Sequence, residues 1–294
     1  MLKIRCVALS IALSFIALAS DVKQGPTGKT IQTLTFQSDS LGQERKFNLL
    51  LPTDYDTSSS RYPVLYLLHG LGDDHMAWAL MTNLSAYAAK HRVIVVMPDV
   101  GRSWYVNNSS DAKAKYEDSI VKDLIPYIDS HYRTVPLRRA RAVAGLSMGG
   151  YGASLIGLKH YQKFTALGSF SGAIGFARDR SAAPAPPPAN AEAARRAEVF
   201  DKMFGAQGSE DRHSKDPFAL ALKVPAAQMP SIYISCGGQD FLLGMNREFV
   251  ALLAAQKIPY EYREFSPAVH SWDVWDHEIR VFLDLLEKRE GWSE

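Results

Sequence analysis

The sequence predicts an α/β fold in which a mainly parallel β-sheet is covered by helices on both faces. Short apolar, β-branched segments alternate along the chain with segments of helical periodicity. Several of the apolar segments are uninterrupted, which is typical of strands buried on both faces. The expected strands are residues 33–37, 47–51, 64–68, 93–97, 142–145, 166–170, 232–236 and 261–265.

Apolar residues at helical spacing predict the covering helices. Each stripe would bury one helix face against the sheet, so we interpret the stripes as core and not as cofactor sites. The three clearest stripes are Ile120, Leu124 and Ile128; Leu242, Met245, Phe249 and Leu253; and Trp275, Ile279, Phe282 and Leu286.

One segment breaks the alternation. Residues 181–197 read SAAPAPPPANAEAARRA, a composition that buries little apolar surface and predicts a surface insertion within residues 173–228. The strand pattern resumes after it, so we expect residues 20–294 to form one catalytic domain.

The N-terminus has the layout of a secretory signal peptide. Lys3 and Arg5 precede an uncharged run from Cys6 to Leu18, and small residues follow it. The run is shorter than the roughly 20 residues of a membrane span. We therefore predict cleavage after residue 19, a secreted or periplasmic protein, and no stable membrane insertion. Cys236 would then be the one remaining cysteine, so no internal disulfide is expected.

Charge gives no indication of a nucleic-acid partner. The formal net charge is +2, and removal of Lys3 and Arg5 leaves 31 basic against 31 acidic side chains. No basic stripe interrupts this balance, so we expect no nucleic-acid binding.

The segment Gly145-Leu146-Ser147-Met148-Gly149 fits the pattern G-x-S-x-G. An expected strand precedes it and an expected helix follows it, which is the strand–turn–helix context of a nucleophile elbow. Such a turn strains the serine backbone, and glycines two residues away on each side avoid side-chain clashes. We interpret Ser147 as a presented nucleophile.

A serine hydroxyl needs a neighbouring base to react at neutral pH. His270 follows the last expected strand and precedes the last helix, where the base of an α/β hydrolase comes in chain order. Asp240 follows the strand 232–236 and a Gly-Gly turn, and its carboxylate would orient the imidazole. Asp216 is the alternative acid, although Asp216-Pro217 also suits a helix cap.

The oxyanion of the reaction also needs hydrogen-bond donors. The strand 64–68 ends in the turn His69-Gly70, which makes the backbone amide of Leu71 one candidate, and the amide of Met148 is the other. His69, Asp73, Asp74 and His75 lack the spacing of a metal site, so no metal is expected.

The segments LHGLGDD, GLSMGGYGA, CGGQDFLL and VHSWDVW, in that order, resemble the esterase D type of α/β hydrolase. This group includes feruloyl and acetylxylan esterases, tributyrin esterase, S-formylglutathione hydrolases and mycolyltransferases. The resemblance runs from about residue 33 to residue 286 and implies the α/β-hydrolase fold. It assigns the nucleophile to Ser147, the acid to Asp240, the base to His270 and the oxyanion donors to the amides of Leu71 and Met148.

We therefore predict a secreted serine carboxylesterase that needs no cofactor and acts on a small-molecule or carbohydrate-linked ester. Trp104 and Tyr105, where relatives place substrate-contacting aromatics, and Trp272 are candidates for the pocket lining, with simple packing as the alternative. Three other functions stay open: acyl transfer of the mycolyltransferase type, S-formylglutathione hydrolysis, and carbohydrate binding without catalysis. The insertion at 173–228 departs from the family pattern.

Overall fold

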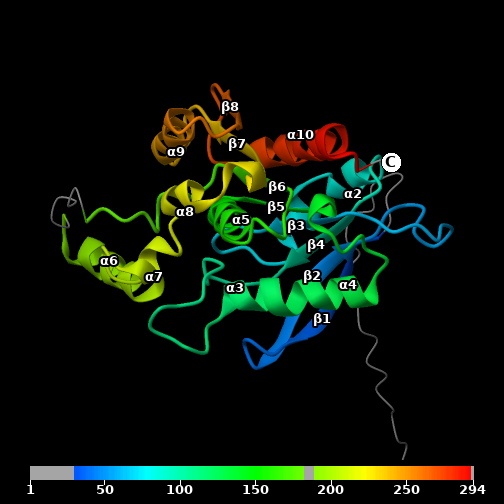
Figure 1. Ribbon diagram of the computed structural model, residues 1–294, viewed down its shortest axis with the longest axis horizontal. Helices are drawn as coiled ribbons and strands as arrows, with labels where there is room; N and C mark the ends of the chain where they lie inside the picture. The colour runs from blue at the N-terminus through cyan, green and yellow to red at the C-terminus, as the bar shows by residue number, and fades with distance from the viewer. Residues whose placement is uncertain (1–29, 182–188, 293–294) are drawn as a thin grey trace, which may run out of the picture.

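The computed structural model describes residues 30–181 and 189–292, so the expected leader at 1–19 and the proline-rich residues 182–188 lie outside it. The described residues form one eight-stranded sheet with helices on both sides (Figure 1). The strands are β1 (Gln32–Ser38), β2 (Gln43–Leu50), β3 (Val64–Leu68), β4 (Ile94–Pro98), β5 (Arg141–Leu146), β6 (Ala166–Phe170), β7 (Ser231–Gly237) and β8 (Glu261–Phe265).

Helices occupy most of the connections between these strands. They are α1 (Ala77–Met81), α2 (Leu84–Ala88), α3 (Tyr116–Asp118), the π-helix η1 (Ser119–Leu124), α4 (Ile125–His131), the 3₁₀ helix η2 (Arg138–Ala140), α5 (Met148–Lys159), α6 (Ala191–Phe204), α7 (Glu210–His213), α8 (Pro217–Lys223), the 3₁₀ helix η3 (Ala226–Gln228), α9 (Leu243–Ala255) and α10 (Trp272–Glu290). Every strand expected from the apolar runs is present, and the predicted α/β-hydrolase architecture is confirmed.

The strand order is β1-β2-β4-β3-β5-β6-β7-β8, with β1 and β2 antiparallel to their neighbours and all other pairs parallel. The chain passes from β3 to β4 on one side of β3, and then crosses to β5 on the other side of β3. In open α/β sheets such a switch point opens a crevice at the carboxyl ends of the strands. The turns after β3 and β5 lie at this crevice.

Two hydrophobic clusters divide the core between the two faces of the sheet. Along β3, Val64, Tyr66 and Leu68 belong to one cluster, whereas Leu65 and Leu67 belong to the other. This alternation follows the two-residue period of a strand. The first cluster lies under η1, α4, α5, α8 and α9, and the second lies under α1, α2 and α10, on opposite sides of the sheet (Figure 1).

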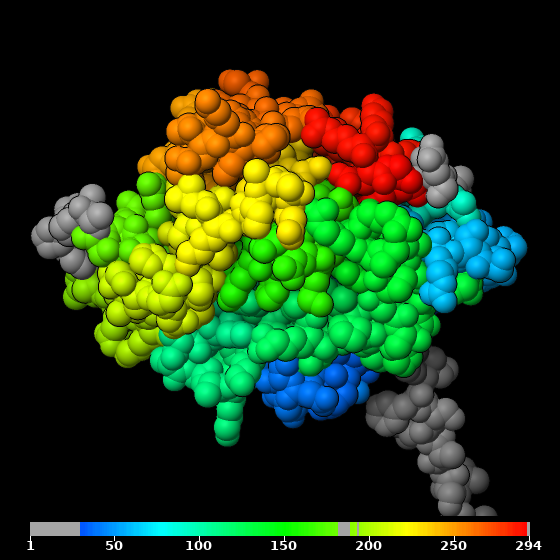
Figure 2. All heavy atoms as spheres, in the orientation of Figure 1, coloured from blue at the N-terminus to red at the C-terminus, as the bar shows by residue number. Residues whose placement is uncertain are grey.

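The described residues at 181 and 189–197 are exposed where the burial of their side chains is described, as their composition predicts, but the end of the following helix is buried. Helix α6 presents exposed side chains at residues 191–192 and 194–199, but Phe204 is fully buried and Phe200 is partly buried. Both rings contact Trp104, with centroid distances of 5.8 and 5.5 Å. The end of α6 is therefore packed on the main domain, although α6 and α7 form a projection at the left of Figure 2.

A buried arginine fixes this end of the insertion. Arg212 is 3% exposed, and its guanidinium donates to the carbonyl oxygens of Gly205 and Ala177 and to the carboxylate of Asp201. A buried charge with several hydrogen bonds tolerates little displacement, because each lost partner would leave a polar group unsatisfied. Residues 173–181 and 201–212 are thereby held together.

We expect Phe204→Ala to lower the free energy of unfolding by about 3–4 kcal/mol, because it removes a buried ring and leaves a cavity. Val199→Ala is the matched control on the same helix, since the Val199 side chain is 50% exposed, and it should change stability by about 0.5 kcal/mol or less. Urea denaturation followed by circular dichroism measures both. Equal, small effects would show that α6 is not anchored to the core.

Candidate active site

Ser147 occupies a strained turn between β5 and α5. Its backbone angles are φ 53° and ψ −116°, a region that side-chain-bearing residues rarely adopt. The Ser147 amide donates to the carbonyl of Phe170, and the Ser147 carbonyl accepts from the amide of Ala173, both at 2.9 Å. These two bonds to the neighbouring strand and its loop hold the turn in place.

The glycine after this serine is required by close packing. A Cβ atom at Gly149 would overlap the backbone carbonyls of Leu68 and His69, at the end of β3. Only glycine lets the start of α5 approach the β3 turn so closely. The strand–turn–helix context that the G-x-S-x-G pattern predicts is present. Gly149 lets the turn at Ser147 lie against the turn that follows β3.

The structure brings Ser147, His270 and Asp240 into one hydrogen-bonded chain. The Oγ atom of Ser147 lies 3.0 Å from Nε2 of His270, and Nδ1 of His270 lies 2.8 Å from Oδ2 of Asp240. With its proton on Nδ1, the imidazole donates to the carboxylate and its Nε2 accepts from the serine hydroxyl. These three residues are separated by up to 123 positions in sequence, and the ends of β5, β7 and β8 position them.

The carboxylate is buried and the imidazole is not. The Asp240 side chain is 0% exposed, whereas that of His270 is 18% exposed. Burial raises the pKa of Asp240, but hydrogen bonds from His270 and from the amide of Leu242 outweigh it, so the pKa lies below its usual value. The group stays a carboxylate at neutral pH and can stabilise a proton on the ring. Asp216, the alternative acid, caps α8 by accepting from the amide of Phe218.

Two aromatic rings contact the imidazole of His270. Trp275 is 5% exposed and packs against it edge to face, with centroids 4.8 Å apart. Phe241 lies 4.6 Å away with a tilt of 53°, and 75% of its surface is exposed. The ring of His270 therefore lies between a buried and an exposed aromatic side chain, which restricts its orientation.

The loops that carry the acid and the base are bonded to each other. The amide of Gln239 donates to the carbonyl of Ala268 at 2.8 Å, and that of Gly238 donates to Phe265 at 2.5 Å. A Cβ atom at Gly237 would overlap the same Ala268 carbonyl. The spacing of Asp240 and His270 is thus set by backbone contacts as well as by their own hydrogen bond.

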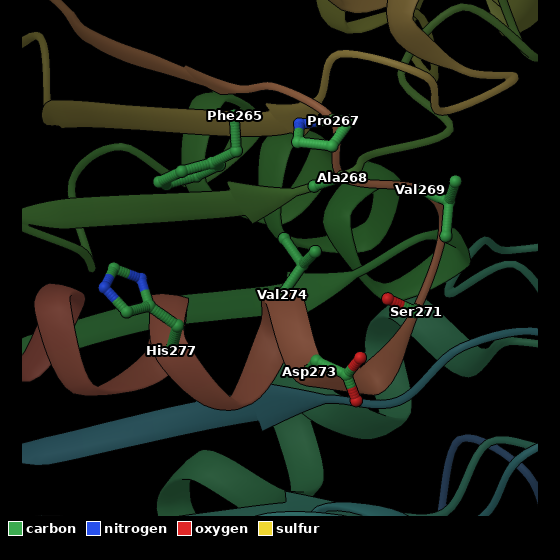
Figure 3. A pocket seen from close by; sticks show the side chains of 8 residues that line it. All are labelled: Phe265, Pro267, Ala268, Val269, Ser271, Asp273, Val274 and His277. Atoms are coloured by element: carbon green, nitrogen blue, oxygen red, sulfur yellow. The ribbon is translucent and has the colours of Figure 1, made fainter.

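A cavity of about 330 Å³ lies beside the loop that carries His270 (Figure 3). Val269 and Ser271, the neighbours of His270 on either side, line it together with Phe265, Pro267, Ala268, Asp273, Val274 and His277. His270 is not part of this lining and contacts Ser147 instead. None of the three residues of the hydrogen-bonded chain lines this cavity.

The turn after β3 faces the serine. A Cβ atom on Gly70 would lie 3.7 Å from that of Ser147. Within the described residues, the amides of Leu71 and Met148 donate no hydrogen bond. Two free amides close to the serine hydroxyl are available to a developing oxyanion.

Buried polar contacts hold this turn. His69 is 1% exposed; its Nδ1 lies 2.8 Å from the carbonyl of Gly70, and its Nε2 accepts from the amide of Val100. Burial lowers the pKa of His69, so the ring is neutral as this pair of bonds requires. Tyr105 and Trp78 donate to the carbonyls of His69 and Leu68.

The aromatic residues that the sequence proposes for the pocket are buried or partly buried. Tyr105 is 0% exposed and Trp104 is 5% exposed, so both pack in the core, and their role in lining a substrate pocket stays a prediction. The glycine-rich helix start leaves room for them: a Cβ at Gly152 would overlap the ring of Tyr105. Trp272 is partly buried between Trp78 and Trp275.

Sequence reasoning missed several supporting residues. Phe241 directly follows Asp240 in the segment CGGQDFLL, and only this position in the sequence indicates that its ring lies near the site. Trp275 appeared as a core residue of the last helix, with no sign that it contacts the base. Within residues 30–181 and 189–292, no three histidine, cysteine or acidic side chains are grouped as metal ligands. No helix in these ranges is long and apolar enough to cross a membrane.

The sheet, its switch point and the elbow between β5 and α5 define an α/β-hydrolase. The chain matches the model of the Esterase family, described as "Putative esterase", over residues 38–283. The chain therefore belongs to this family, and it is an enzyme that hydrolyses carboxylic esters.

Three similar proteins align with this chain over nearly the whole of their own length. The acetyl esterase of Caldicellulosiruptor saccharolyticus is 28% identical over 88% of this chain and 98% of its own. The fluorophosphonate-binding serine hydrolase FphF of Staphylococcus aureus, solved with bound substrate, is 26% identical with a TM-score of 0.72, over 87% of this chain and 98% of its own. An S-formylglutathione hydrolase of the same organism has the same identity and coverages with a TM-score of 0.71.

We expect Gly237→Ala to lower kcat/KM by about tenfold or more, because a small misplacement of reacting groups is costly. The added methyl group would push the Ala268 carbonyl away and separate the acid from the base. Gly244→Ala is the control, since a Cβ there meets nothing within 4 Å. Kinetics with p-nitrophenyl acetate compare the two, and equal activities would contradict the role of this contact.

Proposed function

We propose that the chain is a serine esterase in which Ser147 is the nucleophile, His270 the general base and Asp240 the residue that orients and stabilises the protonated ring. The observation that carries the proposal is the unbroken chain of contacts from Ser147 Oγ to His270 Nε2 at 3.0 Å and from His270 Nδ1 to Asp240 Oδ2 at 2.8 Å. This is the arrangement that nucleophilic serine catalysis needs.

Acylation begins when Ser147 Oγ attacks the ester carbonyl and its proton passes to Nε2 of His270. The Asp240 carboxylate stabilises the imidazolium that forms. The carbonyl oxygen becomes an oxyanion, and we assign its donors to the amides of Leu71 and Met148. Loss of one such donor typically raises the barrier by about 3 kcal/mol.

The intermediate collapses when His270 returns its proton to the alkoxy oxygen and the alcohol leaves. Water then attacks the acyl-enzyme, with His270 accepting its proton. His270 gives this proton to Ser147 Oγ as the acyl–Oγ bond breaks, which releases the carboxylic acid and restores the free serine. Every proton in this cycle moves between Ser147, His270, the alcohol and water. The side chains of the site therefore supply all the acid–base chemistry of ester hydrolysis.

Acyl transfer and thioester hydrolysis use the same residues and differ in the acceptor or the leaving group. With an acetate ester and added alcohol, the proposal predicts free acetic acid as the main product. A new ester as the main product would assign the chain to acyl transfer. A preference for S-formylglutathione over oxygen esters would assign it to the activity of the similar Staphylococcus aureus hydrolase.

We also propose that residues 1–19 are a signal peptide and that residues 20–294 form a single catalytic domain outside the cytoplasm. The support is the sequence of basic residues, uncharged run and small residues that ends at Ala19. N-terminal sequencing of the protein from the periplasm or the medium should begin at Ser20. Recovery of a full-length chain from the cytoplasm alone would contradict this.

We expect Ser147→Ala to lower the kcat of ester hydrolysis by at least about 10⁴-fold, because no other hydroxyl can replace the nucleophile. A fluorophosphonate probe should label the wild-type chain and fail to label the variant. Ser130→Ala is the control: its hydroxyl bonds the Tyr127 carbonyl on the exposed side of α4. Undiminished turnover by Ser147→Ala would refute the assignment, and lack of labelling of the wild type would favour a binding protein.

A further inference from the structure

The position of the base determines where the alcohol part of an ester must lie. In the tetrahedral intermediate the oxyanion points to the amide donors, and the alkoxy oxygen must reach Nε2 of His270 to receive its proton. The carbon attached to that oxygen is then adjacent to the imidazole. An exposed apolar surface beside His270 is therefore near the alcohol part of the ester.

Phe241 is that surface. It contacts the imidazole at a centroid distance of 4.6 Å, and its ring is 75% exposed. The other aromatic neighbour of the imidazole, Trp275, is 5% exposed and has no face to offer. Trp104 and Tyr105 are buried as well. Among these aromatic side chains, Phe241 alone combines contact with the base and a free ring face.

The backbone under Phe241 is fixed. The amide of Asp240 donates to Gly237, and those of Leu242 and Leu243 donate to the carboxylate and the carbonyl of Asp240, at 2.8–3.1 Å. Leu242 is 3% exposed and anchors the start of α9 in the core. A ring on such a rigid turn loses little conformational freedom when it binds a ligand, which favours affinity.

We propose that Phe241 is a specificity-determining residue that binds the alcohol part of the substrate by stacking. The preferred substrates are esters whose alcohol carries an aromatic or other flat apolar group one carbon from the ester oxygen. This inference rests on the proposed esterase function and names its substrate class. Aromatic contacts of this kind contribute about 0.5–1.5 kcal/mol, which corresponds to about a two- to twelvefold change in rate.

Acetate esters of different alcohols test the proposal, because they share one acyl group and one acyl-enzyme. The ratio of kcat/KM for benzyl acetate to that for ethyl acetate should fall about three- to tenfold in Phe241→Ala. The ratio for ethyl butyrate to ethyl acetate should not change, since only the acyl group differs. Phe241→Tyr should restore the benzyl preference, and Phe241→Leu should restore it in part.

Three results would overturn the proposal. An equal loss for every ester would show that Phe241 acts only by holding the imidazole, and a change in the butyrate ratio would place its ring against the acyl group. Failure of the esterase function is distinguishable, because wild-type enzyme would then hydrolyse none of these esters and Ser147 would resist the fluorophosphonate. If Phe241→Ala is active and labelled but keeps the wild-type ratio of kcat/KM for benzyl acetate to ethyl acetate, the stacking role is refuted and the esterase function is not.

Discussion

The backbone of Ser147, at φ 53° and ψ −116°, is the constraint on which the site depends. Such a conformation costs on the order of 1–3 kcal/mol in a residue with a side chain, and it persists only where the surroundings enforce it. Here β6 and its following loop bond both sides of the turn, and Gly149 lets α5 pack on the carbonyls that end β3. Serine, β3 turn and helix start thereby become one rigid unit.

The other parts of the site are supported in the same way, by backbone contacts between adjacent strand ends. The loop after β7 carries the carboxylate, the loop after β8 carries the imidazole, and amide–carbonyl bonds join the two loops. Behind them, Trp275 fills the space between α10 and the imidazole. Polar groups aligned before substrate arrives need no reorganisation during the reaction, which is the main source of electrostatic catalysis.

Most of the large aromatic side chains near the crevice are buried and support its turns, whereas Phe241 is exposed. Tyr105 and Trp78 hydrogen-bond the carbonyls of the β3 turn, and Trp104 receives the phenylalanines of α6. The insertion is thus coupled to the wall that supports the turn, although its helix projects from the domain. Phe241 differs from all of them, because its ring remains exposed beside the imidazole.

The sequence by itself determined the strands, the sheet type and the position of the strained turn at Ser147. Apolar periodicity and the glycines around Ser147 are local signals, and they required no knowledge of distant contacts. Chain order was enough to select Asp240 over Asp216 and His270 over the other histidines. Only the tertiary structure decided which aromatic rings are buried. An aromatic residue has the same sequence signature in a core and in a pocket, so Trp104, Tyr105 and Phe241 could be told apart only by their neighbours from other strands and helices.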